Sequence, residues 1–208
     1  MACVTASDQR LGPYRPILRA RFRAAALLLA ATVSAAPARA EELTPRKSAL
    51  LLLRVLVYDR NLKARAGDVV RVALAFRPGD RGSEQERDEL VAALEEVSRE
   101  VVALGLPVGV VAVPYHDPAD FEARLVRNAP ACVYVCASLD PMVKEITWAA
   151  QRHGVLTASS SRRMAESGLA LALVNRGKRA GIVVNLPAAK AAGADLDAAL
   201  LAIAEVIP

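Results

Sequence analysis

Short apolar runs rich in β-branched residues alternate with segments of helical periodicity along most of this chain, and no other feature constrains its fold as strongly. Residues 68–76 are apolar apart from two charged positions and end at the turn Arg77-Pro-Gly-Asp80, which predicts a buried strand. Similar runs predict three more strands, at 107–113, 132–137 and 155–158.

Helices are predicted before the first strand and between the later ones, from apolar side chains at three- and four-residue spacing. Ser83 and Glu86 have the spacing of a capping box, which predicts where one helix starts. Gly67 is a stop signal for the first, amphipathic helix. The predicted helices cover 45–66, 83–105, 117–128 and 140–154.

The end of the chain departs from the alternation. Residues 169–174 and 180–186 flank Asn175-Arg-Gly-Lys-Arg179, which predicts an antiparallel hairpin, and a closing helix is expected from about Ala188 or Asp195 to Ile207. Strands linked by helices form parallel sheets covered on both faces. We therefore predict an α/β fold, a three-layer sandwich whose mostly parallel sheet has about six strands and a C-terminal antiparallel hairpin at one edge.

The first forty residues resemble an export signal. Several arginines precede an apolar run from Ala24 to Ala36, and Ala38-Arg39-Ala40 has the small residues that a signal peptidase recognises. A transmembrane anchor is the alternative, but the run has 13 residues where a spanning helix needs about 20. We expect residues 1–40 to be a signal peptide cleaved near Ala40, residues 41–208 to be a single domain, and the protein to be periplasmic.

Charge argues against a nucleic-acid partner. The chain has 27 Lys and Arg against 22 Asp and Glu, but residues 1–40 hold six Arg and one Asp, so the remainder has 21 of each sign. A net charge near zero lacks the basic surface that nucleic-acid binding requires.

The two cysteines of the exported part lie on one predicted strand. Cys132 and Cys136 are four residues apart, roughly 13 Å in an extended chain, which is too far for a disulfide. We interpret them as small buried side chains, with an intermolecular disulfide or a redox-sensitive thiol as the alternative. His116 and His153 are the only histidines, and their spacing matches no zinc pattern, so no metal site is predicted.

Ligands of open parallel sheets bind outside the carboxyl ends of the strands. The segments that follow the predicted strands are 77–81, 114–117, 138–140 and 159–163. In the last of them, hydroxyl groups and backbone N–H groups at a helix start lie beside two arginines, a combination that suits a phosphate or carboxylate. The alternative is a helix cap with a solvated basic turn. The candidate anion site consists of Ser159, Ser160, Ser161, Arg162 and Arg163.

No catalytic pattern is evident. His116 and Asp117 are adjacent and do not converge on one reacting atom, so Asp117 is better explained as a helix cap. The sequence has no G-x-S-x-G elbow, Walker loop, dinucleotide fingerprint or HExxH motif. We predict a protein that is not an enzyme and needs no cofactor; an unrecognised enzyme would have to use Ser159, Ser160 or His116.

A glycine-led strand (168–173), an Ile/Val-x-x-Asn-Leu strand (182–189), and a Gly-Ala-Asp-Leu segment (193–196) followed by a Leu-Leu-x-x-Ala helix (200–204) are found in the last third of the chain. These segments resemble the C-terminal half of the YfiR family. The helix Ala49–Asn61 resembles the family's opening helix.

The resemblance implies an exported, non-catalytic regulatory adaptor that binds the periplasmic sensor part of a membrane protein, a diguanylate cyclase of the cyclic-di-GMP pathway, and holds it inactive. It also implies a homodimer, and contact with the membrane only through the partner. The family's disulfide arrangement does not carry over to two cysteines placed as they are here. A single-lobe periplasmic solute-binding protein is the alternative.

An adaptor needs a partner surface. Exposed apolar groups on the first helix and unpaired backbone at the hairpin edge are the features that could meet a partner. On that helix, Leu52 and Val55 could belong to such a surface, and the alternative is that they pack in the core. The candidate partner surface consists of Tyr58, Arg176, Lys178 and Arg179.

Overall fold

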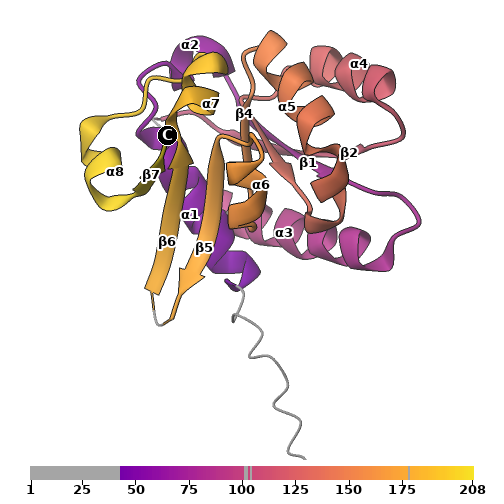
Figure 1. The fold of residues 1–208 in the computed structure, drawn as a ribbon, viewed down its shortest axis with the longest axis horizontal. Helices are drawn as coiled ribbons and strands as arrows, with labels where there is room; N and C mark the ends of the chain where they lie inside the picture. Colours follow the sequence, from indigo (N-terminus) through magenta and orange to yellow (C-terminus); the bar gives the residue numbers. More distant parts are fainter. Residues whose placement is uncertain (1–42, 101–102, 104, 178) are drawn as a thin grey trace, which may run out of the picture. The chain divides into compact units, whose positions relative to one another are not determined.

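The computed structural model describes residues 43–100, 103, 105–177 and 179–208. These residues build one seven-stranded sheet with the strand order β2-β1-β3-β4-β5-β6-β7 (Figure 1). All neighbouring strands are parallel except β5 and β6, which pair antiparallel. The strands are β1 Val70–Phe76, β2 Val108–Pro114, β3 Cys132–Val135, β4 Leu156–Ser159, β5 Leu171–Arg176, β6 Arg179–Asn185 and β7 Glu205–Ile207.

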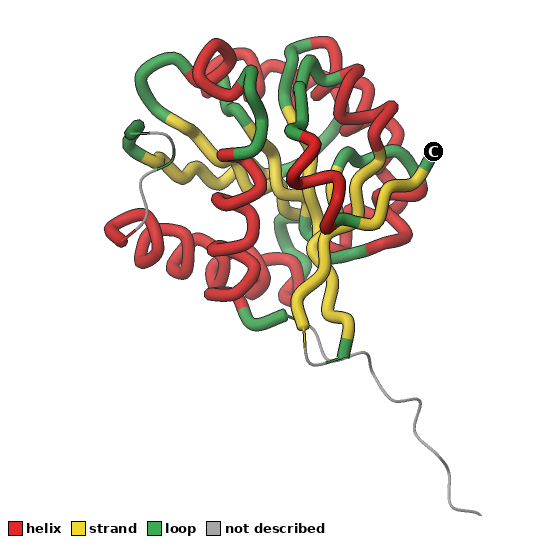
Figure 2. Tube along the Cα trace, turned by 90° about the vertical axis from the view of Figure 1, so that its left-hand side faces the viewer, coloured by secondary structure: helices red, strands yellow, loops and turns green. Residues whose placement is uncertain are grey.

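Helices cover both faces of the sheet, as the change of view in Figure 2 makes clear. The helices are α1 Pro45–Val57, α2 Leu62–Ala66, α3 Arg81–Glu100, α4 Pro118–Asn128, the 3₁₀ helix η1 Ala137–Met142, α5 Val143–Arg152, α6 Arg162–Glu166, α7 Leu186–Ala191 and α8 Ala198–Ile203. One buried cluster joins α1 and α3 to the sheet, and a second joins α4 and α5 to its other face.

Alternation along the strands explains the two clusters. On β1, Val72 and Leu74 belong to the cluster with α1 and α3, whereas Ala73 and Ala75 belong to the cluster with α4 and α5. Successive side chains of a strand point to opposite faces, so a strand that is apolar throughout needs a cover on each side. The predicted three-layer α/β sandwich with a mostly parallel sheet is confirmed.

The end of the chain differs from the prediction. The expected closing helix is two short helices, because Gly193 has a φ of 74° and Asp197 caps the start of α8 through the N–H of Ala199. The last residues then form β7, which pairs parallel with β6 from Val183 to Asn185. The antiparallel hairpin is present, but β7 is the outermost strand and satisfies part of the hairpin's free edge.

The predicted opening helix is interrupted. It ends at Val57 and resumes as α2, because the fully buried carboxylate of Asp59 accepts hydrogen bonds from the N–H groups of Asn61 and Asp195. Asp59 also forms an ion pair with Arg65. The break therefore serves a buried polar contact that helical periodicity does not reveal.

The predicted capping box at Ser83 is wrong. Asp80 caps α3 by accepting the N–H of Ser83 at 2.8 Å, and the Ser83 hydroxyl accepts the N–H of Arg77 at 2.9 Å. Glu86 accepts hydrogen bonds from Tyr134 of β3 and from Ala137 at the start of η1.

The predicted signal peptide lies outside the described residues. Within the described part of the chain, none of the helices combines the length and hydrophobicity that crossing a bilayer demands.

Candidate functional site

A cleft of about 730 Å³ opens at the carboxyl ends of β1 and β3. The chain leaves β1 for β2 on one side and later returns to β3 on the other, so the strand order reverses between β1 and β3. Ligands of open α/β sheets bind at such a switch point, and the volume lies within the usual range for small molecules. The cleft is therefore the candidate functional site.

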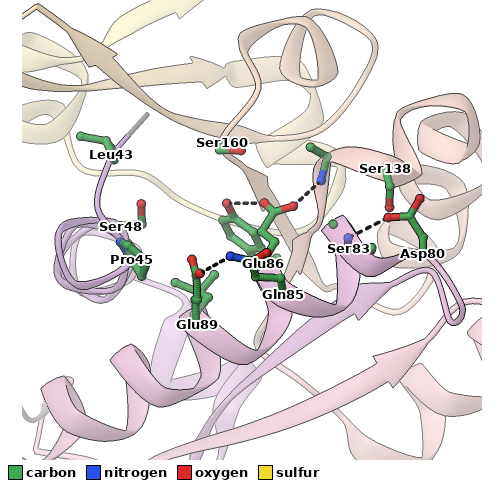
Figure 3. Close-up of a pocket in the computed structure, with 14 residues that line it drawn as sticks. Leu43, Pro45, Ser48, Asp80, Ser83, Gln85, Glu86, Glu89, Ser138 and Ser160 are labelled. Carbon is green, nitrogen blue, oxygen red and sulfur yellow. Dashed lines mark hydrogen bonds between the residues drawn. The ribbon is translucent and has the colours of Figure 1, made fainter. Parts of the chain in front are cut away.

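Four parts of the chain line the cleft (Figure 3). They are the start of α1, the first half of α3, the end of β3 with η1, and the loop after β4. The lining residues are Leu43, Pro45, Ser48, Asp80, Gly82, Ser83, Gln85, Glu86, Glu89, Leu90, Tyr134, Ala137, Ser138 and Ser160.

Glu86 fixes the geometry of the cleft wall. One of its carboxylate oxygens accepts the Tyr134 hydroxyl at 3.1 Å, and the other accepts the N–H of Ala137 at 2.8 Å (Figure 3). Burial raises the pKa of Tyr134 well above its usual value, and the nearby carboxylate of Glu86 raises it further. Tyr134 is therefore a neutral hydrogen-bonding group at any physiological pH.

The Ser138 hydroxyl oxygen is buried and has no hydrogen-bond partner among the described residues. A buried hydroxyl is normally paired, because leaving it unpaired costs about 1–3 kcal/mol. Ser138 lines the cleft. The wall of the cleft therefore contains an unsatisfied buried hydroxyl.

The lining carries one sign of charge. Asp80, Glu86 and Glu89 are acidic, and none of the residues that line the cleft is Lys or Arg. The hydrogen bonds of Asp80 and Glu89 come from neutral donors, the N–H of Ser83 and the amide of Gln85. The charged side chains that line the cleft are therefore all acidic.

The predicted anion-site residues have different contacts in the structure. Ser159 is fully buried and its hydroxyl bonds to the backbone of Ser161, whose own hydroxyl caps α6 through the N–H of Met164. Arg162 pairs with Glu166 and Glu205, and Arg163 pairs with Asp140. Of the five residues only Ser160 lines the cleft, as Tyr134 also does.

The other sequence candidates lie away from the cleft. His116 is exposed, His153 contacts Glu122 at 2.8 Å, and Asp117 caps α4 as predicted, through the N–H of Asp120. In the described part of the chain, no three or more His, Cys, Asp or Glu side chains are placed to hold one metal ion.

Both cysteines are fully buried, which confirms their interpretation as core side chains, and both are free thiols. Burial raises the pKa of Cys132 to about 12, and it raises the pKa of Cys136 as well. Neither thiol is a reactive thiolate near neutral pH.

The segments that follow the predicted strands contain part of the cleft lining and not the rest. Inspecting the segments after the strands identified Asp80, Ser138 and Ser160. It missed Glu86 and Glu89, which are charged residues in a helix and resemble any solvated face. A signal was available, because the i, i+3 spacing of these two glutamates places both on one side of α3.

The predicted partner-surface residues form two separate patches. Tyr58 is 38% exposed at the end of α1, where its carbonyl accepts the N–H of Asp197 near the amino ends of the strands. Arg176 and Arg179 are exposed at the hairpin turn, which follows the carboxyl end of β5 (Figure 1). Arg176 forms an ion pair with Glu205 of β7, and Lys178 lies outside the described residues.

The fold and the cleft define a class of proteins, the open α/β sandwiches with a ligand-sized hollow at the switch point of a parallel sheet. The profile of the YfiR/HmsC-like family matches residues 84–205. Because this match covers more than half of the chain, the chain belongs to the YfiR/HmsC-like family, as the sequence resemblance indicated. No curated protein sequence matches it.

Solved structures with a similar fold are distant in sequence. A ligand-free, open substrate-binding protein with adhesive properties from Clostridium difficile is 12% identical, with a TM-score of 0.53 over 71% of this chain and 57% of that one. A conserved domain protein from Vibrio cholerae is 15% identical, with a TM-score of 0.53 over 79% and 60% of the two chains. An ABC domain in complex with L-Trp from Streptococcus pneumonia is 14% identical, with a TM-score of 0.50 over 74% and 62%.

This chain thus spans about three fifths of the length of these similar structures. At such low identities they show the shared fold alone.

Proposed function

We propose that the exported chain is a non-catalytic regulatory adaptor, which binds the periplasmic part of a membrane signalling protein, a diguanylate cyclase, and restrains it. The observation that carries the proposal is membership of the YfiR/HmsC-like family over residues 84–205. The near-zero net charge of residues 41–208 agrees with a role in protein contact rather than nucleic-acid binding.

The exposed hairpin turn is our first choice of contact surface. Arg179 is exposed there and forms no ion pair with another described residue, whereas Arg176 pairs with Glu205. Arginine is common at interface hot spots because its planar group can stack and form several hydrogen bonds at once. Tyr58 lies at the other end of the strands and is therefore a separate candidate patch.

Crosslinking in the native host is the first experiment. A C-terminally tagged chain is expressed, crosslinked in the envelope, purified and identified with its partners by mass spectrometry. Recovery of a membrane protein with a cyclase domain supports the proposal, and the N-terminal peptide of the recovered chain reports whether cleavage occurs near Ala40. Recovery of this protein alone, at full expression, contradicts the proposal.

The regulatory claim has its own measurement. Deleting the gene should raise cellular cyclic-di-GMP, and restoring the wild-type chain should lower it again. Arg179→Glu should fail to restore the low level, whereas Arg127→Glu, a matched charge reversal at an exposed position of α4, should restore it. Equal behaviour of the two variants would exclude the hairpin as the contact surface, and an unchanged level on deletion would exclude the regulatory role.

A solute-binding protein is the second candidate, and the cleft at the switch point is the observation that favours it. Such a protein would bind its solute without any membrane partner. Its melting temperature should then rise with ligand, since a hundredfold excess over the dissociation constant stabilises a protein by about 2.7 kcal/mol. A ligand response combined with no crosslinked partner would favour this candidate over the adaptor.

A further inference from the structure

We propose that the cleft binds a linear polyamine, a small organic cation with ammonium groups at both ends and no carboxylate. The proposal concerns the cleft alone and stands whether or not the chain restrains a cyclase. Four observations lead to it: the sign of the lining charge, the state of the helix starts, the unpaired Ser138 hydroxyl and the spacing of the carboxylates.

The charge of the lining selects a cation. Asp80, Glu86 and Glu89 face the cleft, and none of its lining residues is Lys or Arg (Figure 3). A carboxylate or phosphate ligand would meet this negative wall without a compensating side chain. An amino acid would bring its own carboxylate to the same wall, so an amine without a carboxylate fits better.

The helix starts at the cleft do not reverse this preference. Backbone N–H groups at a helix start normally attract anions, but here carboxylate oxygens of the protein accept several of them. Asp80 accepts the N–H of Ser83, and Glu84 accepts that of Gly79. At η1, Glu86 accepts the N–H of Ala137. These three carboxylates therefore place acceptor oxygens at both helix starts, and such oxygens accept hydrogen bonds from ammonium groups.

Ser138 supplies an independent sign of a ligand. Its hydroxyl oxygen is buried and lacks a hydrogen-bond partner among the described residues, although the residue lines the cleft. An ammonium N–H can donate to this oxygen, which removes the cost of leaving it unpaired.

The spacing of the carboxylates selects a long molecule over a single ion. Asp80 and Glu89 are nine residues apart along α3 and its cap, which corresponds to roughly 13 Å at 1.5 Å per residue. In the described part of the chain, the acidic groups are not placed to hold one metal ion. Leu43, Pro45 and Leu90 add an apolar lining on which an alkyl chain can pack.

Calorimetry on the exported, tagged protein tests the proposal with spermidine as the probe. We expect one bound spermidine per chain and an affinity that falls as salt rises, because the attraction is between charges. Butylamine, with one ammonium group, and lysine, with an added carboxylate, should each bind at least about tenfold more weakly, because each loses one charge-assisted contact or adds a repulsive one.

Variants locate the binding site. Asp80→Asn removes a charge but keeps a residue that caps helices equally well, and Glu89→Gln changes an exposed position. Each should weaken spermidine binding by roughly tenfold, as expected for a charge-assisted hydrogen bond. Glu95→Gln is the matched control, because Glu95 is exposed on the same helix but does not line the cleft. If Asp80→Asn does not fold, Glu89→Gln carries the test.

Ser138→Ala separates a ligand contact from a structural one. It should weaken binding several-fold while leaving the unfolding midpoint unchanged or higher, since the hydroxyl has no partner to lose. Three results would overturn the proposal: no heat with spermidine, equal weakening by Glu95→Gln, or calcium or glutamate binding more tightly than spermidine.

Discussion

The two ends of the parallel sheet use the same kind of group for different purposes. At the amino ends, the buried carboxylate of Asp59 accepts two backbone N–H groups and is neutralised by Arg65. At the carboxyl ends, Glu86 also accepts two hydrogen bonds, but it belongs to a wall with two further carboxylates and no lining cation.

Arg65 completes the contrast. Its guanidinium also donates to the carbonyls of Ala131 and Gly154, both at 2.9 Å, and so joins α2 to the segments that lead into β3 and β4. The amino end is a closed network that ties the elements together. At the carboxyl end, the carboxylates of Asp80 and Glu89 are at least partly exposed in the cleft lining, and an exposed group is available to a ligand.

The strongest test of this contrast is Asp59→Ala. Removing one partner of a buried ion pair leaves the other uncompensated, which costs about 3–5 kcal/mol. Urea unfolding should show a loss of that size, whereas Asp68→Ala, at an exposed aspartate nearby, should change stability by less than about 0.5 kcal/mol. A loss below about 1 kcal/mol at Asp59 would show that the amino end is not the stabilising network we describe.

Glu86→Ala tests the carboxyl end and should have a smaller effect. The variant loses the contacts to Tyr134 and Ala137, and unpaired buried groups cost about 1–3 kcal/mol. Because the Glu86 carboxylate is a secondary cause of the raised pKa of Tyr134, that pKa should fall, yet stay above its usual value because burial remains. Ultraviolet titration with Tyr134→Phe as the reference measures the shift, and an unchanged pKa would contradict the contact.

The two cysteines report on the ends of β3. Cys132 lies at its amino end and Cys136 follows its carboxyl end, beside the cleft wall. Both thiols should resist labelling at pH 8 because burial raises each pKa. Each single variant keeps one of the two thiols, so mass spectrometry measures one labelling rate at a time. If the cleft end of β3 opens more readily, Cys136 in the Cys132→Ser variant should be labelled several-fold faster than Cys132 in the Cys136→Ser variant. The reverse order would place the weaker end at Asp59.

Glu205 should give the smallest effect, because its contacts are partly exposed. Hydrogen bonds from Arg162 lower its pKa, and the charges of Arg162 and Arg176 add to this. A carboxyl group whose pKa is lower in the folded state than in the unfolded state stabilises the fold at any pH above its unfolded-state pKa. That stabilisation is lost as the pH falls through its folded-state pKa. Glu205→Gln should therefore flatten the acid limb of the stability curve below about pH 4.5, the ordinary Glu value. Urea midpoints against pH, with Glu95→Gln as the control, measure this; equal acid limbs would contradict it.

The sequence predicted the fold better than it predicted the site. The β/α alternation gave four parallel strands and the hairpin because periodicity records which face of each element is buried. It did not predict β7, because Glu205-Val-Ile207 is three residues long and continues the helical spacing of Leu200 and Leu201. Its extended conformation depends on pairing with β6, which is a contact between segments about twenty residues apart.

The same reason explains the cleft. Asp80, Ser138 and Ser160 follow strands, so a rule about strand ends finds them. Glu86 and Tyr134 acquire their roles only when α3 packs beside β3, a contact between residues 48 apart in the chain.

By itself, the sequence determined the three-layer architecture, the burial of both cysteines and the resemblance to the YfiR family, because these depend on hydrophobic patterns that each segment carries locally. Only the tertiary structure decided where the opening helix breaks, which strand forms the sheet edge and which carboxylates share the cleft. These features depend on contacts between side chains from distant segments, and local periodicity contains no information about such long-range contacts.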